Sequence, residues 1–311
     1  MFKRINSSVM LALVFVSMFM LSVGVVAAQG VRFQELTAAM LPWDAVPSPD
    51  GSVVYFTAIG SDGTPGVFSV PSAGGEASVV KAGRPLVMPL GIAISTDGQM
   101  LYVSDPWTAG SDGSAVYALA ISTGEATVVE GTQGTAPQGV EVMSRDGADW
   151  IYFTGMDVGD GQPAVYRVAA AGGDVTQIAK GAPLVAPSGV ALAQDGTVYV
   201  LDRLASGNGM GAVLRIQGNT VDIIARDVRT GGQLAGIALT LDESLLLASS
   251  LDTEAGTAQV LVINLATMET SIINEVINQS ITAGGLHRAH DVNMFAWADV
   301  QRPGRIYRVD P

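Results

Sequence analysis

The sequence predicts an all-β protein, and within that class a six-bladed β-propeller of four-stranded antiparallel blades. Three observations support this prediction. A unit of nearly constant length recurs six times, each unit holds short apolar segments separated by Gly-rich turns, and no stretch keeps the period of a long helix. Four-stranded units that repeat about every 40–50 residues are typical of propeller blades.

The first 28 residues are predicted to be a signal peptide. Lys3 and Arg4 give a basic start, an apolar run follows from 9 to 28, and Val26–Ala28 fits a small-x-small cleavage signal. We therefore expect export to the periplasm or the medium, with the propeller occupying residues 29–311 as one domain. The apolar run is also long enough to span a bilayer at about 20 residues, so an uncleaved membrane anchor is the alternative.

The repeat is marked by an aspartate that ends the first apolar strand of each unit. These aspartates are Asp50, Asp97, Asp146, Asp195, Asp242 and Asp291, with spacings of 47, 49, 49, 47 and 49 residues. The first four precede a glycine, which suits the positive φ angles of a tight hairpin turn. We interpret these Asp-Gly turns as structural, and expect looser turns after Asp242 and Asp291.

Each unit is predicted to contain four strands, A to D, in chain order. The first unit supplies VVYFT (53–57), GVFSV (66–70) and ASVV (77–80) as strands B to D. The second supplies GIAI (91–94), MLYVS (100–104), AVYALA (115–120) and ATVVE (126–130). The third supplies GVEV (139–142), WIYFT (150–154), AVYRVA (164–169) and VTQIA (175–179). The fourth supplies GVAL (189–192), TVYVL (197–201), AVLRI (212–216) and VDIIA (221–225), and GIAL (236–239) begins the fifth.

The sixth unit ends after three strands, GGLHRAH (284–290), MFAWAD (294–299) and GRIYRVDP (304–311). A strand-like segment, VRFQELT (31–37), precedes the first unit. We expect this N-terminal strand to complete the last blade and close the ring, because closure removes exposed strand edges that invite aggregation.

These blades resemble those of the TolB-like six-bladed propeller superfamily. SPDGSVVYFTA and GVFSVPSAGGE are similar to TolB-type blades. PSGVALAQDGTVYVLDR and GAVLRI are similar to blades of the SMP-30/gluconolactonase, NHL and strictosidine-synthase-like group. The resemblance covers nearly all of residues 38–311 and implies the fold. It does not select a function, because propellers include hydrolases, lyases and binding scaffolds.

Charge and cysteine content restrict the partners of this chain. It has 16 Lys and Arg against 29 Asp and Glu, and no cysteine. Because Lys3 and Arg4 lie in the signal segment, its removal changes the net charge from −13 to −15. An acidic chain without a basic run is not expected to bind nucleic acid or an anionic membrane. Without disulfides, the hydrophobic core alone must stabilise the fold. We also expect a monomer.

Candidate ligand-binding residues are the positions that interrupt the repeat. Strand A faces the channel, where Gly, Ala and Val dominate, and the D–A and B–C loops form the face on which propellers usually bind ligands. A buried charge is costly unless it is paired, so charged residues in strand A are informative. The candidates are Asp44, Gln138, Glu141, Ser188, His287, Arg288 and, on the loop face, Trp107.

Glu141 and His287 occupy the same repeat position in the third and sixth units, so they face each other across the axis. We expect them to be too far apart to touch, and to be bridged by a ligand or an ordered water. A model histidine titrates near pH ~6.5, so ligand binding is predicted to depend on pH. The alternative is that Glu141 pairs with a backbone amide or a loop arginine.

The sequence favours no cofactor, with a divalent cation such as calcium as the alternative. SMP-30-type lactonases, whose blades these resemble, have a metal-binding motif with Glu or Asn before strand A. This chain departs from that motif, with Trp43, Leu90, Gln138 and Ser188 at those positions. Only the strand-B aspartates of the motif are matched, by Asp105, Asp202 and Asp299, which leaves few oxygen ligands for a hard cation. Asp44, one residue after Trp43, could partly substitute for the missing ligand. Calcium in the B–C turns is the other option, at Asp62, Asp112, Asp160 and Asn208. His287 and His290 point to opposite faces of a strand, which argues against zinc.

Two functions are consistent with these observations, and no catalytic residue is assigned. The first is an exported binding scaffold that holds a small molecule, a glycan or a protein on its loop face. The alternative is an SMP-30/gluconolactonase-like hydrolase or NHL-type lyase acting at the central channel. The chain has no cysteine nucleophile and no G-x-S-x-G motif.

Overall fold

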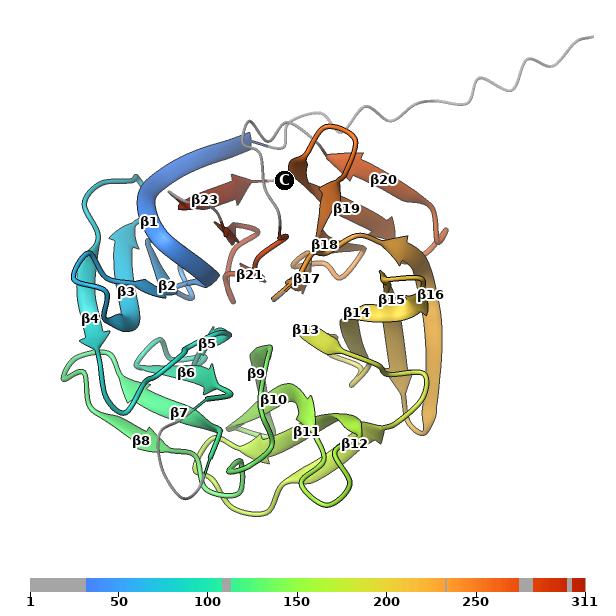
Figure 1. The fold of residues 1–311 in the computed structure, drawn as a ribbon, viewed down its shortest axis with the longest axis horizontal. Coiled ribbons are helices and arrows are strands. Elements are labelled where there is room, and N and C mark those ends of the chain that lie inside the picture. The colour runs from blue at the N-terminus through green and yellow to red at the C-terminus, as the bar shows by residue number, and fades with distance from the viewer. Residues whose placement is uncertain (1–31, 108–112, 233, 274–281, 301–303, 311) are drawn as a thin grey trace, which may run out of the picture.

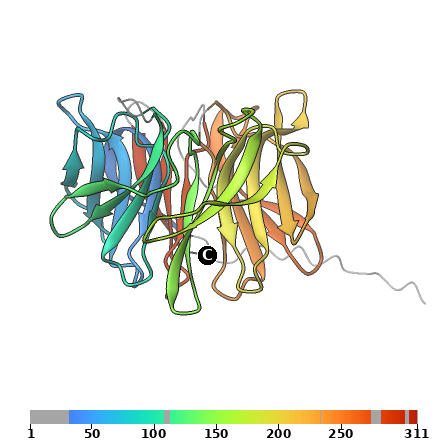
Figure 2. The ribbon, with the colours of Figure 1, turned by 90° about the horizontal axis from the view of Figure 1, so that it is seen from below.

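A computed structural model describes residues 32–107, 113–232, 234–273, 282–300 and 304–310. The predicted signal peptide lies outside these residues. Within these ranges every regular element is a strand, and the strands form five sheets that stand around a central axis (Figures 1 and 2). The strands nearest the axis are β5, β9, β13, β17, β21 and the end of β1 (Figure 1). In the part of the chain described, no helix is long and apolar enough to cross a membrane.

Four of the sheets are separate four-stranded antiparallel blades. The first contains β5 (Ile92–Ile94), β6 (Met100–Asp105), β7 (Ala115–Ala120) and β8 (Ala126–Val128). The second contains β9 (Val140–Arg145), β10 (Ala148–Met156), β11 (Pro163–Ala169) and β12 (Thr176–Lys180). The third contains β13 (Pro187–Leu192), β14 (Val198–Gly207), β15 (Met210–Gln217) and β16 (Thr220–Val228). The fourth contains β17 (Ile237–Leu239), β18 (Leu245–Asp252), β19 (Thr257–Asn264) and β20 (Thr270–Ile273).

The fifth sheet has seven strands, and we call it the joined sheet. In spatial order it contains β21 (Leu286–Arg288), β22 (Phe295–Asp299), β23 (Gly304–Asp310), β1 (Arg32–Pro47), β2 (Val53–Ile59), β3 (Pro65–Pro71) and β4 (Ser78–Ala82).

The prediction of six separate closed blades is wrong, because β1 is shared. Its first half, from Arg32 to Ala39, pairs with β23, and its second half, from Met40 to Pro47, pairs with β2 with a register shift between Met40 and Asp44. The chain therefore has four blades and one curled seven-stranded sheet where two further blades were expected. Pro42 does not interrupt β1, because it lies in the register shift between Met40 and Asp44, where its missing N–H costs no ladder hydrogen bond.

The A–B turns have the structural role that the sequence predicts. Gly98 has a φ of 71°, and the Asp97 carboxylate accepts hydrogen bonds from Ser95 Oγ at 2.6 Å and from the Gln99 amide at 3.0 Å. The turn at Asp242 is not looser. Thr240 Oγ1 donates to Asp242 at 2.7 Å, and Glu243 has a φ of 57° in place of a glycine.

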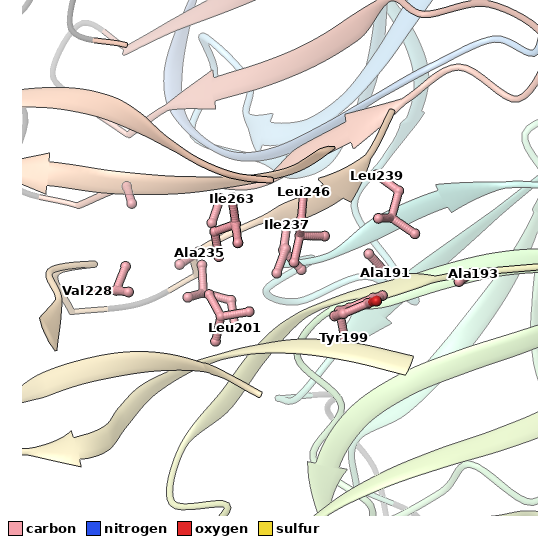
Figure 3. Close-up of a cluster of buried hydrophobic side chains, with 13 residues drawn as sticks. Ala191, Ala193, Tyr199, Leu201, Val228, Ala235, Ile237, Leu239, Leu246 and Ile263 are labelled. Carbon is pink, nitrogen blue, oxygen red and sulfur yellow. The ribbon is translucent and has the colours of Figure 1, made fainter. Parts of the chain in front are cut away.

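The hydrophobic core lies between neighbouring sheets. Figure 3 shows the cluster between the blade of β13–β16 and the blade of β17–β20, where Leu201 faces Ile237 and Leu246. All three side chains are fully buried. Burying one such side chain stabilises a fold by about 1.5–3 kcal/mol, so these contacts hold adjacent sheets together.

Hydroxyl groups near the axis also join the sheets. Thr154 Oγ1 accepts from the Gly139 amide of its own blade at 3.0 Å and donates to the Ser188 carbonyl of the next blade at 2.6 Å. We call such a pair of bonds a hydroxyl link. The other hydroxyl links are made by Thr57, Ser104 and Ser249.

Candidate functional site

The central channel is closed at the end where the D–A loops enter the first strands. Glycines at the start of these strands bring the backbones together: a Cβ atom at Gly139 would collide with the Ser188 carbonyl, and one at Gly236 with the Leu286 backbone. The space left between these glycines, Asp44 and His287 does not admit a water molecule. A ligand cannot enter the channel from this end.

Three ionisable side chains meet inside the channel, and we call Asp44, His287 and Glu141 the axial triad. His287 Nε2 lies 3.0 Å from Asp44 Oδ2, and His287 Nδ1 lies 3.0 Å from Glu141 Oε2. The expectation that Glu141 and His287 are too far apart to touch is therefore wrong. The narrow glycine-lined channel brings the opposite walls within hydrogen-bonding distance.

The carboxylates of the axial triad are also held by the backbone. Asp44, with 1% of its side chain exposed, accepts from the amides of Ala45 at 2.9 Å and Ile92 at 3.0 Å. Glu141 Oε1 accepts from the Val142 amide at 2.9 Å, so the alternative of a backbone partner is also met. The side chain of Glu141 is 17% exposed, against 5% for His287. Glu141 is thus the member of the triad that a ligand can touch.

The triad holds His287 as an imidazolium. Burial alone would lower the pKa of His287, but the charges and hydrogen bonds of Asp44 and Glu141 raise it to about 10. For Glu141, burial favours the neutral acid, yet His287 and the Val142 amide lower its pKa below the ordinary value. His287 therefore does not titrate near pH 6.5, so the predicted pH response near neutrality is wrong for this group. With a proton on each ring nitrogen, it offers no lone pair to a metal.

Beyond Glu141 the channel widens into a pocket of about 230 Å³ that opens among the A–B turns, and we call it the axial pocket. This mouth lies on the face opposite the D–A and B–C loops. The polar side chains that line the pocket belong to Thr96, Glu141, Ser144, Gln194, Arg288, His290 and Asp291.

Arg288 is fixed in the wall of the axial pocket by backbone carbonyls. Its Nε donates to Leu239 O at 2.8 Å, and its Nη1 donates to Ala289 O and, at 3.1 Å, to His290 O. Burial lowers the pKa of Arg288, while the carboxylate of Glu141 opposes that shift. Guanidinium groups nevertheless stay charged in proteins. The pocket therefore contains one fixed cation, Arg288, and one fixed anion, Glu141, while the carboxylate of Asp291, which also lines it, is exposed.

No family model matches this sequence, and no curated protein matches it. Solved structures do. A gluconolactonase from Xanthomonas campestris has a TM-score of 0.64 and 18% identity, over 90% of this chain and 89% of that one. A TolB from Acinetobacter baumannii has a TM-score of 0.57 and 14% identity, over 78% of this chain and 55% of that one. An oligogalacturonate lyase in complex with manganese has a TM-score of 0.51 and 14% identity, over 91% and 79%.

The chain has a β-propeller fold. Identities this low show the fold alone, so they place the chain among propellers of this kind without assigning an activity.

The other predicted residues of the propeller lie outside the axial pocket. Ser188 is buried, and its Oγ accepts from the Ala235 amide at 2.8 Å, which gives it a role between blades. The carbonyl of Gln138 accepts the hydroxyl link from Ser104. Trp107 is 57% exposed and follows β6 at the end of the blade away from the A–B turns. The structure thus brings together Asp44, Glu141, His287 and Arg288, and separates them from these three.

Two of the matched strand-B aspartates, Asp105 and Asp202, bind the backbone of the propeller. Asp105 Oδ2 accepts from the amides of Val87 at 2.6 Å and Met88 at 3.0 Å, and Asp202 makes the equivalent bonds in its own blade. Their carboxylates fix the D–A loops. In the B–C turns, Asp62 accepts from the Thr64 amide and Asp160 from Lys180, while Asp112 lies outside the described residues.

Five polar residues that line the axial pocket were not predicted as site residues: Ser144, Asp291, Thr96, Gln194 and His290. The last three share one repeat position, directly before the aspartate of an A–B turn, in alternate units. That shared position was the signal that could have found them. His290 Nε2 donates to the Ile94 carbonyl at 3.0 Å across the pocket wall.

Proposed function

We propose that this propeller is an exported, monomeric binding protein that holds a small polar molecule in the axial pocket and catalyses no reaction there. The observation that carries the proposal is the axial triad. Its members are held by ion pairs and backbone amides, so they form a rigid, charged floor.

The protonation states of the triad favour binding over catalysis. A general base works best with a pKa near the operating pH, whereas the pKa of Glu141 is lowered and that of His287 is raised to about 10. Glu141 is a poor proton acceptor near neutrality, and His287 a poor donor. A permanently charged carboxylate suits the recognition of a ligand.

Export is proposed on the N-terminal pattern of a basic start, an apolar run and a small-x-small end. We also propose that the chain groups with SMP-30/gluconolactonase and NHL propellers. That grouping suggests a hydrolase or lyase as the alternative to a binding protein. No feature of the axial pocket favours that alternative over binding.

Thermal unfolding of the purified protein with a library of small polar metabolites tests the proposal. A ligand that binds only the folded state raises the melting temperature by mass action. Ser144→Trp, at an exposed position lining the pocket, should block that rise. Ser122→Trp, at an exposed position in the turn between β7 and β8, is the matched control and should leave it unchanged.

The same preparation should be tested for hydrolysis of aldonolactones and cleavage of oligogalacturonate, with and without Mn²⁺ or Ca²⁺. We expect no turnover. Turnover that is lost in Glu141→Gln would replace the binding proposal with the enzyme alternative.

A further inference from the structure

We propose that the ligand of the axial pocket is a small zwitterion of the α-amino-acid type, with its ammonium on Glu141 and its carboxylate on Arg288. This inference rests on the proposed function and names its ligand class.

The anionic half of the recognition is the carboxylate of Glu141. Each carboxylate oxygen can accept two hydrogen bonds, and each is used once: Oε2 by His287 and Oε1 by the Val142 amide. Acceptor capacity therefore remains on a carboxylate that lines the pocket and is partly exposed. A protonated amine satisfies it with charge-assisted N–H···O bonds, which are shorter and stronger than neutral ones.

The cationic half is the guanidinium of Arg288. Nε and Nη1 are directed at the carbonyls of Leu239, Ala289 and His290. Within the described residues, Nη2 has no acceptor and Arg288 forms no ion pair. A fixed guanidinium with free N–H groups matches a carboxylate better than any other common side chain does.

Charge balance selects a ligand that carries both signs. A ligand that displaces water from the pocket must compensate the charges it desolvates, because an uncompensated buried charge is costly. Asp44 and Glu141 share one imidazolium, so the triad keeps a net negative charge, and a monoanion would leave that charge without a partner. A monocation would leave the charge of Arg288 without a partner. A neutral polyol would compensate neither. Only a zwitterion compensates both the carboxylate of Glu141 and the guanidinium of Arg288.

Size and apolar lining narrow the class further. The axial pocket has a volume of about 230 Å³, which is below the roughly 300–1,000 Å³ of pockets that bind drug-sized ligands. Ala191, Ala238 and Leu239 contribute apolar wall next to the charged groups. These features fit a small amino acid with a short aliphatic side chain.

Isothermal titration and thermal unfolding with four probes test this inference: L-alanine, ethylamine, propionate and glycerol. We expect L-alanine to bind and the other three to bind at least about tenfold more weakly. Glu141→Gln and Arg288→Gln should each weaken L-alanine binding by about tenfold to hundredfold, the loss expected for one charge-assisted contact. Arg226→Gln, at an exposed arginine of β16, is the control and should change nothing.

The outcomes separate this inference from the proposed function. If glycerol, propionate or ethylamine binds as well as L-alanine and Ser144→Trp blocks it, the zwitterion class is wrong and the binding function stands. If neither the probes nor the metabolite library raises the melting temperature in a way that Ser144→Trp blocks, both the zwitterion class and the binding function are wrong. The four probes compared on the wild-type protein decide between the ligand classes, so that comparison does not depend on the folding of Glu141→Gln or Arg288→Gln.

Discussion

Replacing His287 by glutamine removes the cation that lies between two carboxylates. In the wild type both ring nitrogens lie 3.0 Å from a carboxylate oxygen, and Asp44 has only 1% of its side chain exposed. Removing one partner of a buried ion pair costs about 3–5 kcal/mol, because the other charge stays buried without compensation.

The assay is equilibrium unfolding in urea at pH 7. We expect His287→Gln to lower the free energy of unfolding by about 3–5 kcal/mol, a large share of the roughly 5–15 kcal/mol typical of a domain. His290→Gln is the matched control. That histidine donates one hydrogen bond to a backbone carbonyl, which a glutamine amide can replace, so its cost should stay below about 1 kcal/mol. Equal stability of the two variants would refute the paired triad.

The pH dependence of stability gives an independent check with a defined sign. The folded pKa of His287 lies above its unfolded value, so folding takes up a proton at this site. Its contribution is fully present below pH 6.5, declines as the pH rises, and is lost once the pH passes about 10. The stability gap between wild type and His287→Gln should therefore narrow in alkali. A gap that is constant from pH 6 to pH 10 would contradict this assignment.

Three further predictions concern the rest of the chain. Mass spectrometry of the exported protein should find Gln29 as the first residue, whereas an intact Met1 end would indicate a membrane anchor. Thr154→Val should lower the free energy of unfolding by about 1–2 kcal/mol through loss of its hydroxyl link, and Thr127→Val, at an exposed position of β8, should not. Deleting residues 32–39 should lower the denaturant midpoint of the whole domain, because β23 keeps only its pairing with β22 and loses its pairing with β1. An unchanged midpoint would show that the pairing of β1 with β23 does not contribute to stability.

The repeat made the strands and turns predictable from the sequence. Alternating apolar residues and the Asp-Gly pairs are local signals, so the A–B turns and most strand positions follow from a few neighbouring residues. The continuity of β1 is not a local property. A proline such as Pro42 usually indicates the end of a strand. Whether its missing N–H costs a ladder hydrogen bond depends on the register of the partner strands.

The candidate site was predictable in part, for the same reason. The shared repeat position of Glu141 and His287 places them opposite each other, but their contact depends on the width of the channel. That width is set by backbone contacts between glycines of neighbouring sheets. The pocket lies among the A–B turns because the glycines close the opposite end, which no single strand reveals.

The shared strand β1 also fixes when the protein can finish folding. Residue 32 pairs with residue 310, so half of β1 must wait until almost the whole chain is present. Contacts of such sequence separation carry a large loop-closure entropy and form slowly. A chain threaded across a membrane from its N-terminus would emerge with this half-strand unpaired and would acquire its partner last. The domain is thus completed late, when β23 inserts between β22 and β1. Until then the edges of β1 and β22 are unpaired and can pair with strands of other chains.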